Sequence, residues 1–320
     1  MKPPYEITNT ILSLYGRITE ALGICKSLLL VKPEARLRRQ NRIRTIHSSL
    51  AIEGNTLGID NISAILDKTP VIGPKKDILE VKNAIAAYDK LPFFGPFSIN
   101  DFLKAHDVLM NGLVERSGSF RNIQVGILKG NDVSHIAPGY DRVPGLMNDL
   151  FQYVKKDSDI DIIKSCVFHY EMEFIHPFED GNGRMGRFWQ TRLLMSVNPI
   201  FEFVPVEKVI KENQDKYYEA LEESDSTGRS TKFIEFMLDA INKSLRETID
   251  EANVPNIDHK KRVESALIEL NDWFDRKDYM RVCKGISTAT ASRDLKQMLD
   301  DELIDISGIG RMTKYKKKGG

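Results

Sequence analysis

Cysteine is scarce in this sequence. Its three cysteines, Cys25, Cys166 and Cys283, lie far apart and lack the short spacing of paired metal ligands. A disulfide-held secreted scaffold and a cysteine metal site both need more numerous or more closely spaced cysteines. We therefore expect buried thiols in a reducing compartment.

Long hydrophobic runs and an excess of one charge are also missing. The first residues, MKPPYEITNT, lack the apolar core of a signal peptide, and apolar runs such as residues 28–31 are too short to cross a bilayer. Lys plus Arg and Asp plus Glu each number 46, so the overall charge attracts neither nucleic acid nor an acidic membrane. These absences predict a soluble, cytoplasmic protein with no membrane partner.

Apolar residues recur at helical spacing along most of the chain, without an internal repeat or a low-complexity segment. Gly54 and Asn55 supply a helix-ending signal, and Ser98 or Asn100 is suited to begin a helix as its N-cap. The helices predicted in this way cover residues 8–30, 34–53, 80–91, 100–113, 143–155, 161–176, 184–197, 207–223 and 231–252.

Two regions depart from this helical pattern. Residues 120–141 are rich in Val, Ile, Gly and Asn, with the turn sequence KGND at 129–132, and this predicts a β-hairpin. After a short linker at 254–258, residues 259–320 show a helix, a turn, a helix and two short strands joined by Gly-Ile-Gly. That order predicts a winged helix-turn-helix domain.

The run HPFEDGNGRMGR, residues 176–187, combines several groups that can bind a triphosphate. Its Gly-Asn-Gly segment precedes a predicted helix, where backbone amides and the helix dipole favour an anion. Arg184 and Arg187 are three residues apart near the positive end of that helix, which is unfavourable unless an anion is present. Asp180 is a carboxylate suited to Mg²⁺, and His176 has the pKa range of a general base.

Each of these features taken alone is more often structural. A histidine at a helix end, a Gly-Asn-Gly turn and arginines paired with surface carboxylates are all common in protein folds. Their conjunction in one short segment favours a functional site.

The same run resembles the Fic motif His-x-Phe-x-Asp/Glu-Gly-Asn-Gly-Arg-x-x-Arg at every specified position. The resemblance implies a mostly α-helical bundle of the Fic type with a small β-hairpin flap. It also implies transfer of AMP from ATP to Ser, Thr or Tyr hydroxyls of proteins, with Mg²⁺ or Mn²⁺ as cofactor and release of pyrophosphate.

The resemblance also implies a role for each motif residue. His176 corresponds to the general base, Asp180 to the metal ligand and Phe178 to a buried anchor of the loop. The implied nucleotide ligands, from the α-phosphate region to the β- and γ-phosphates, are Gly181, Asn182, Gly183, Arg184 (β) and Arg187 (γ).

Two other segments are similar to parts of the family. Residues 120–138 resemble the flap that pairs with a target protein as an added strand, although a purely structural hairpin is the alternative. Tyr217 and Tyr218, in NQDKYYEAL, resemble the segment that lines the adenine pocket. Their alternative role is ordinary aromatic core.

A second motif lies in the helix predicted over 34–53. Ser49 and Glu53 share one helix face, and Glu53 lies at the C-terminal end, where the dipole disfavours a carboxylate. SLAIEG, residues 49–54, resembles the Fic inhibitory motif Ser/Thr-x-x-x-Glu-Gly/Asn in its arrangement N-terminal to the core. The resemblance implies that Glu53 pairs with Arg187 and keeps it from the γ-phosphate. There are two alternatives for Glu53. It is an ordinary exposed glutamate at a helix end, or it positions a water molecule for AMP removal.

Residues 287–303, STATASRDLKQMLDDEL, have the spacing of a recognition helix, with Arg293 and Lys296 expected to face outward. The wing adds basic residues that could contact a phosphate backbone: Arg311, Lys314, Lys316, Lys317 and Lys318. The acidic residues that weaken a DNA-binding face are Asp294, Asp300, Asp301 and Glu302. DNA binding and a packing or protein-contact role therefore both stay open.

The sequence thus predicts an N-terminal helical region with the inhibitory helix at 1–95, a Fic catalytic core at 96–252 and a winged-helix domain at 259–320. The favoured function is an autoinhibited protein adenylyltransferase. AMP removal, another nucleotide or phosphate transfer at the same site, and a nucleotide-sensing transcription regulator are the alternatives. A metal hydrolase using His169 and His176 is disfavoured because no third ligand has suitable spacing. The target protein, self-modification and a homodimer stay open.

Overall fold

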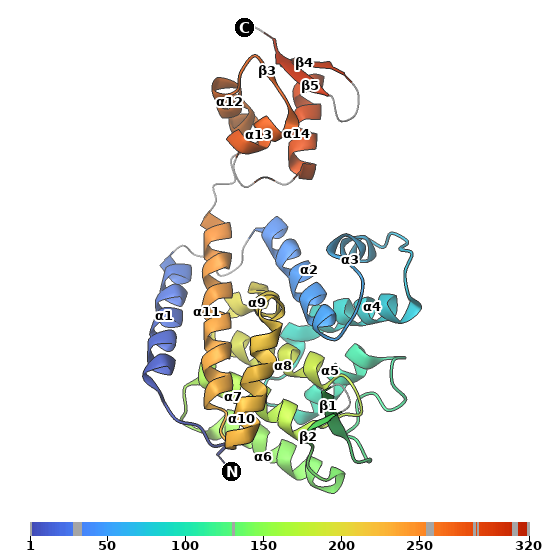
Figure 1. Ribbon diagram of the computed structural model, residues 1–320, viewed down its shortest axis with the longest axis vertical. Helices are drawn as coiled ribbons and strands as arrows, with labels where there is room; N and C mark the ends of the chain where they lie inside the picture. Colours follow the sequence, from blue (N-terminus) through green and yellow to red (C-terminus); the bar gives the residue numbers. More distant parts are fainter. Residues whose placement is uncertain are drawn as a thin grey trace. The chain divides into compact units, whose positions relative to one another are not determined.

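The computed structural model describes residues 2–27, 34–129, 132–253, 259–283, 286, 288–308 and 313–318. The chain divides into two compact units, residues 1–253 and 254–320, and each has its own hydrophobic core (Figure 1). Both units are mainly helical, which confirms the predicted fold class. Within the described residues, no helix is long and apolar enough to cross a membrane. Cys25, Cys166 and Cys283 are buried and free, as predicted.

The first unit is a bundle of helices with one small hairpin. Its α-helices are α1 (Asn9–Ser27), α2 (Ala35–Ile52), α3 (Ile59–Leu66), α4 (Lys75–Lys90), α5 (Ile99–Met110), α6 (Val143–Lys156), α7 (Asp161–Ile175), α8 (Asn182–Val197), α9 (Val206–Glu212), α10 (Gln214–Thr227) and α11 (Thr231–Asn253). Short 3-10 helices are η1 (Leu91–Phe93), η2 (Tyr140–Arg142) and η3 (Pro199–Phe203). Strands β1 (Gly126–Lys129) and β2 (Asp132–Ile136) form the predicted antiparallel hairpin.

Helices α7 and α8 pack tightly against each other in the middle of this bundle (Figure 1). Phe168 of α7 and Trp189 of α8 are fully buried, so both helices are covered by apolar residues of their neighbours. Gly186 permits the close approach, because a Cβ there would lie 2.8 Å from the His169 ring and 2.9 Å from Glu173 Oε1. This packing fixes the two helix ends that flank residues 176–181.

The observed helices differ from the predicted ones at several places. α3 was not predicted, because eight residues with one buried side chain, Ile62, give too short a periodic signal. The single helix predicted over 207–223 is two helices, since the backbone leaves the helical region at Asn213. Ser98 is the N-cap of α5 and accepts a hydrogen bond from the Asp101 N–H at 3.2 Å. Residue 30, the predicted end of the first helix, lies outside the described residues.

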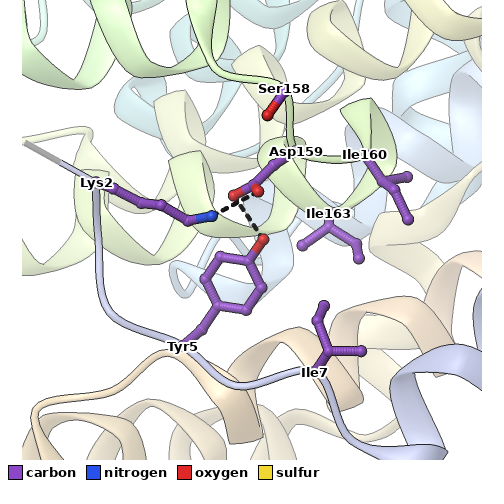
Figure 2. Close-up of a pocket in the computed structure, with 7 residues that line it drawn as sticks. All are labelled: Lys2, Tyr5, Ile7, Ser158, Asp159, Ile160 and Ile163. Atoms are coloured by element: carbon purple, nitrogen blue, oxygen red, sulfur yellow. Dashed lines mark hydrogen bonds and ion pairs between the residues drawn. The ribbon is translucent and has the colours of Figure 1, made fainter.

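The N-terminal segment is fastened to the bundle by polar contacts. The N–H of Glu6 donates to Thr231 Oγ1 at 3.0 Å, and Asp159 accepts hydrogen bonds from Lys2 and the Tyr5 hydroxyl, each at 2.6 Å (Figure 2). These contacts border a surface cavity of about 270 Å³. Its other lining residues are Ile7, Ser158, Ile160 and Ile163. No residue of the 176–187 run lines this cavity.

The second unit contains three helices and a three-stranded antiparallel sheet in its described part. The elements are α12 (His259–Glu269), β3 (Trp273–Phe274), α13 (Arg276–Val282), α14 (Thr288–Asp300), β4 (Ile304–Ser307) and β5 (Lys314–Lys317), with the strand order β3-β5-β4. The described part thus has three helices and three strands where two of each were predicted, and the winged-helix class stays a prediction.

Asp294 was predicted to be one of the acidic residues on the outer face of α14. The structure corrects this prediction, because the Asp294 side chain is buried. It is 4% exposed, accepts two hydrogen bonds from Arg262 at 2.7 and 2.8 Å, and accepts one from the Tyr279 hydroxyl at 3.0 Å. Apolar spacing does not reveal a buried ion pair, so this pair could not be predicted from the sequence. Arg293 and Lys296 are exposed as predicted, and Arg311 lies outside the described residues.

We expect Asp294→Ala to lower the stability of the second unit by about 3 kcal/mol, because it leaves a largely buried guanidinium without its carboxylate. Hydrogen exchange in the full chain should become faster in peptides from 259–300 and stay unchanged in peptides from 143–253. Asp300→Ala, an exposed position on the same helix, is the control. Equal exchange in the two variants would contradict the role of this pair.

Candidate active site

His176 occupies the turn that ends α7. Its backbone is left-handed, with φ 49° and ψ 61°, and its N–H donates to Met172 O at 3.0 Å. The ring Nδ1 lies 3.3 Å from Glu173 O. A carbonyl oxygen only accepts, so Nδ1 carries the hydrogen and the basic nitrogen of the neutral ring is Nε2. The turn therefore sets the tautomer that a general base needs.

Arg121 fastens the hairpin to this turn. Its Nε donates to His176 O at 2.8 Å, its Nη1 donates to Ile123 O at 2.8 Å, and its Nη2 donates to Pro138 O. The residue is buried, and burial lowers the pKa of its guanidinium. Both ends of the hairpin region are thus tied to the backbone of His176. This role could not be predicted from the sequence, since one arginine before a hairpin forms no pattern.

The loop after His176 is closed by Asn182. Its Oδ1 accepts from the Phe178 N–H and its Nδ2 donates to Phe178 O, both at 2.9 Å. Phe178 is fully buried, as predicted. The Asn182 side chain is therefore occupied with the loop, and a contact from this residue to a phosphate would come from its backbone N–H.

His106 supports the loop from α5, and sequence reasoning missed it. Its ring stacks on Phe178 with centroids 3.6 Å apart, and its Nδ1 accepts from the Gly118 N–H at 2.9 Å. Its Nε2 then carries the hydrogen and donates to Asp180 O at 3.1 Å. Burial lowers the pKa of His106 to about 4, so the ring is neutral near pH 7. Asp180 is thus held through its own backbone.

The N-terminus of α8 gathers the predicted nucleotide ligands. Gly181 has φ +84° and touches Met110, so a side chain there would be both strained and crowded. Asp180 Oδ1 accepts from the Gly181 N–H at 2.6 Å and from Arg184 Nη2 at 3.1 Å. Arg184 is buried and also donates to Glu80 of α4 at 3.1 Å. The motif residues are therefore brought together, with Arg184 already paired.

Arg187 is paired with the end of α2. Its Nη2 donates to Glu53 Oε1 at 2.7 Å and to Ser49 O at 3.0 Å, and its Nε donates to Ser49 Oγ at 3.2 Å. Burial opposes the charge of Arg187, but Glu53 holds its pKa above the ordinary value. A Cβ on Gly183 would overlap the Glu53 carboxylate. The carboxylate thus lies on the first turn of α8, where an anion is favoured.

Two buried ionisable groups interact electrostatically with Arg187 and are themselves mostly neutral. Burial lowers the pKa of His169 to about 3 and raises the pKa of Glu173 to about 8. His169 Nδ1 donates to Gln190 Oε1 at 2.7 Å. Oε1 of Glu173 is buried without a hydrogen-bond partner among the described residues. Neither group was predicted as part of the site.

The two tyrosines of α10 have different surroundings. Tyr217 is 2% exposed, its hydroxyl lies 3.2 Å from His169 Nε2, and its ring packs on Phe233. Tyr218 is 44% exposed. The structure therefore places Tyr217 in the core, and only Tyr218 of the pair has a face exposed for stacking.

The described residues contain no group of three or more His, Cys, Asp or Glu able to hold a metal ion. Asp180 has a half-exposed side chain and lies directly before Gly181, at the start of α8. Mg²⁺ is commonly held by one or two carboxylates together with substrate phosphates and water. The residues present therefore fit a metal ion that arrives with a nucleotide.

Residues 96–194 match the Fic/DOC family. A solved Fic family protein from Desulfovibrio desulfuricans G20 is 37% identical with a TM-score of 0.77, over 100% of this chain and 99% of that one. Fic-1 from C. elegans, at 22% identity and a TM-score of 0.59, shares the fold over 76% of this chain and 71% of that one. The chain belongs to the Fic family.

Curated relatives carry the name protein adenylyltransferase. The protein adenylyltransferase Fic of Nematostella vectensis is 27% identical over 77% of this chain and 56% of its own length. Protein adenylyltransferase fic-1 of Caenorhabditis elegans is 30% identical over 58% of this chain and 37% of its own length. The chain thus spans about half or less of the length of these relatives.

We expect Glu173→Gln to change how stability depends on pH. Between the ordinary carboxyl value of 4.5 and about 8, the folded wild type holds a proton that the unfolded chain has lost. Wild-type stability therefore falls as pH rises through this window, by at most about 1.4 kcal/mol per pH unit, and Glu173→Gln removes that loss.

Urea unfolding at several pH values measures the effect. Relative to wild type, Glu173→Gln should gain stability as pH rises, while Glu219→Gln, at an exposed position, should run parallel to wild type. A Glu173→Gln curve that also runs parallel would show that Glu173 is not held protonated.

Proposed function

We propose that this chain is a protein adenylyltransferase that moves AMP from ATP to a protein hydroxyl. The observation that carries the proposal is the anion-binding turn of α8, where Glu53 lies on Gly183 and pairs with Arg187. A site that accommodates a carboxylate there is suited to a phosphate. The names of the curated relatives point to the same activity.

The chemistry needs one base and a well-placed hydroxyl. The target oxygen attacks the α-phosphorus, its proton passes to Nε2 of His176, and the bond from that phosphorus to the pyrophosphate oxygen breaks. Mg²⁺ held by Asp180 and the phosphate oxygens would supply positive charge to the departing pyrophosphate. Arg121 keeps His176 in place, because it binds the histidine's own carbonyl oxygen.

The first turn of α8 would bind the phosphates. Backbone N–H groups of Asn182 and Gly183 point out of the helix start, where an anion is stabilised. Arg184 would bind the β-phosphate and Arg187 the γ-phosphate, and both lie on α8 one turn apart. Tyr218 is the tyrosine suited to stack on the adenine.

The target protein would dock on the hairpin. In the described residues β1 and β2 form a two-stranded sheet, so each has one edge outside the ladder. A target segment added as a strand would be bound through its backbone, and its sequence would matter little. Arg121 links this hairpin to the general base, which would bring the target hydroxyl near His176.

Glu53 would act as an internal brake. While Arg187 is bound to Glu53 and Ser49, it cannot bind the γ-phosphate in the pose that attack requires. The same carboxylate is also placed to position a water molecule for AMP removal, which is the second candidate activity. Cytoplasmic location, a homodimer and DNA binding by residues 259–320 stay predictions.

We expect Glu53→Gly to raise transfer of label from α-labelled ATP with Mg²⁺ by at least about tenfold. This factor corresponds to the loss of an inhibitory contact worth about 1.4 kcal/mol. Glu53→Gly/His176→Ala should lose about 10²-fold or more of that transfer. γ-labelled ATP should label nothing. Glu212→Gly, at the exposed end of α9, is the control and should behave as wild type.

The transferase proposal fails if no variant incorporates α-label, even with a lysate that supplies targets. AMP removal becomes the favoured activity if wild type releases AMP from a protein modified by the Glu53→Gly variant, and if Glu53→Gly itself does not release it.

A further inference from the structure

Arg184 and Arg187 are both buried, and each is paired with a carboxylate from outside residues 96–194. Glu53 pairs with Arg187, and Glu80 pairs with Arg184. The mechanism proposed above uses Glu53 but gives no role to Glu80. Glu80 is 7% exposed and lies on α4, so its carboxylate is enclosed beside Arg184.

The Arg184 guanidinium is held at two separate nitrogens. Nη1 donates to Glu80 Oε1 and Nη2 donates to Asp180 Oδ1, each at 3.1 Å. The Asp180 side chain is half exposed, and it is the carboxylate expected to turn to the metal ion when nucleotide binds. Glu80 is then the contact that continues to hold Arg184.

Glu80 is itself held in place. Its Oε2 accepts from Asn55 Nδ2 at 2.7 Å, and the same nitrogen donates to Asp77 O at 3.2 Å. Asn55 Oδ1 accepts from the Leu57 N–H at 3.1 Å. Both oxygens of Glu80 are thus engaged, and its carboxylate has one defined orientation.

We propose that Glu80 is a positioning residue that orients Arg184 toward the β-phosphate of the nucleotide. The inference rests on the proposed function, because it takes Arg184 as the β-phosphate ligand. It predicts that Glu80 acts on nucleoside diphosphates and triphosphates and not on the monophosphate, which has no β-phosphate.

A glutamine cannot replace Glu80. The groups hydrogen-bonded to its two oxygens, Arg184 Nη1 and Asn55 Nδ2, are both donors, and Lys76 Nζ lies 4.0 Å from Oε1. A side-chain amide has one accepting oxygen, so either orientation places two donors against each other. Glu80→Gln therefore releases Arg184 or the loop at Asn55, with little change in side-chain volume.

The test is calorimetric binding of AMP and ADP to the full chain with constant Mg²⁺, in the Glu53→Gly background so that Arg187 is released. Arg184→Ala is the reference, and Lys82→Gln, an exposed change on α4, is the control. Glu80→Gln should weaken ADP by about tenfold, the size of a charge-assisted hydrogen bond, and leave AMP within about twofold. Asn55→Ala should shift the ratio of ADP to AMP affinity in the same direction by less.

The outcomes separate the two proposals. If Arg184→Ala lowers the ADP to AMP affinity ratio while Glu80→Gln and Asn55→Ala do not, the role of Glu80 is refuted and the proposed function stands. If Glu80→Gln weakens both nucleotides equally, its role is only structural and the inference is also refuted. If Arg184→Ala leaves the ratio unchanged, the β-phosphate assignment fails, and the inference fails with it.

Discussion

Arg187 carries a positive charge into the interior of the first unit, with 2% of the residue exposed. It lies near the positive end of α8, so both its burial and the helix dipole call for an anion beside it. The Glu53 carboxylate meets that need at 2.7 Å, with Ser49 as a second partner. Because α2 must end where Glu53 can reach, Gly54 with φ +88° stops the helix at that position.

The surroundings of this pair add little competing charge. His169 is neutral because burial lowers its pKa, and Glu173 stays mostly protonated near pH 7 because burial raises its pKa to about 8. Glu53 is the carboxylate that contacts Arg187 directly. An incoming phosphate would replace one anion by another, and the helices around it would not need to rearrange their core.

The sequence was informative where the chemistry is contiguous. The 176–187 run predicted a turn suited to an anion, and the resemblance of residues 49–54 to the Fic inhibitory motif implied the pairing of Glu53 with Arg187 that the structure shows, because each motif is encoded within a dozen residues. The residues it missed act over long sequence separations: Arg121 on His176, His106 on Asp180, and Glu80 on Arg184. One residue that contacts a distant backbone oxygen leaves no periodic trace.

The other differences between the predictions and the structure concern which side chains are buried. Tyr217 and Tyr218 are adjacent and alike in sequence, yet α10 turns one into the core and the other outward. Aspartate is usually a surface residue, but Asp294 is buried in the second unit, where it accepts hydrogen bonds from Arg262 and Tyr279. Helical spacing predicted where most of the helices lie and could not indicate which polar side chains they would enclose.

We propose that Glu53 and the γ-phosphate of ATP compete for Arg187. The most direct measurement is a pair of crystal structures, of wild type and of the Glu53→Gly variant, each with Mg²⁺ and a non-hydrolysable ATP analogue. We expect the variant to bind the γ-phosphate at Arg187 with the phosphates along the first turn of α8, and wild type to keep Glu53 on Arg187 with the γ-phosphate displaced. A γ-phosphate bound to Arg187 in wild type while Glu53 stays in contact, or triphosphate bound away from α8 in the variant, would contradict the claim.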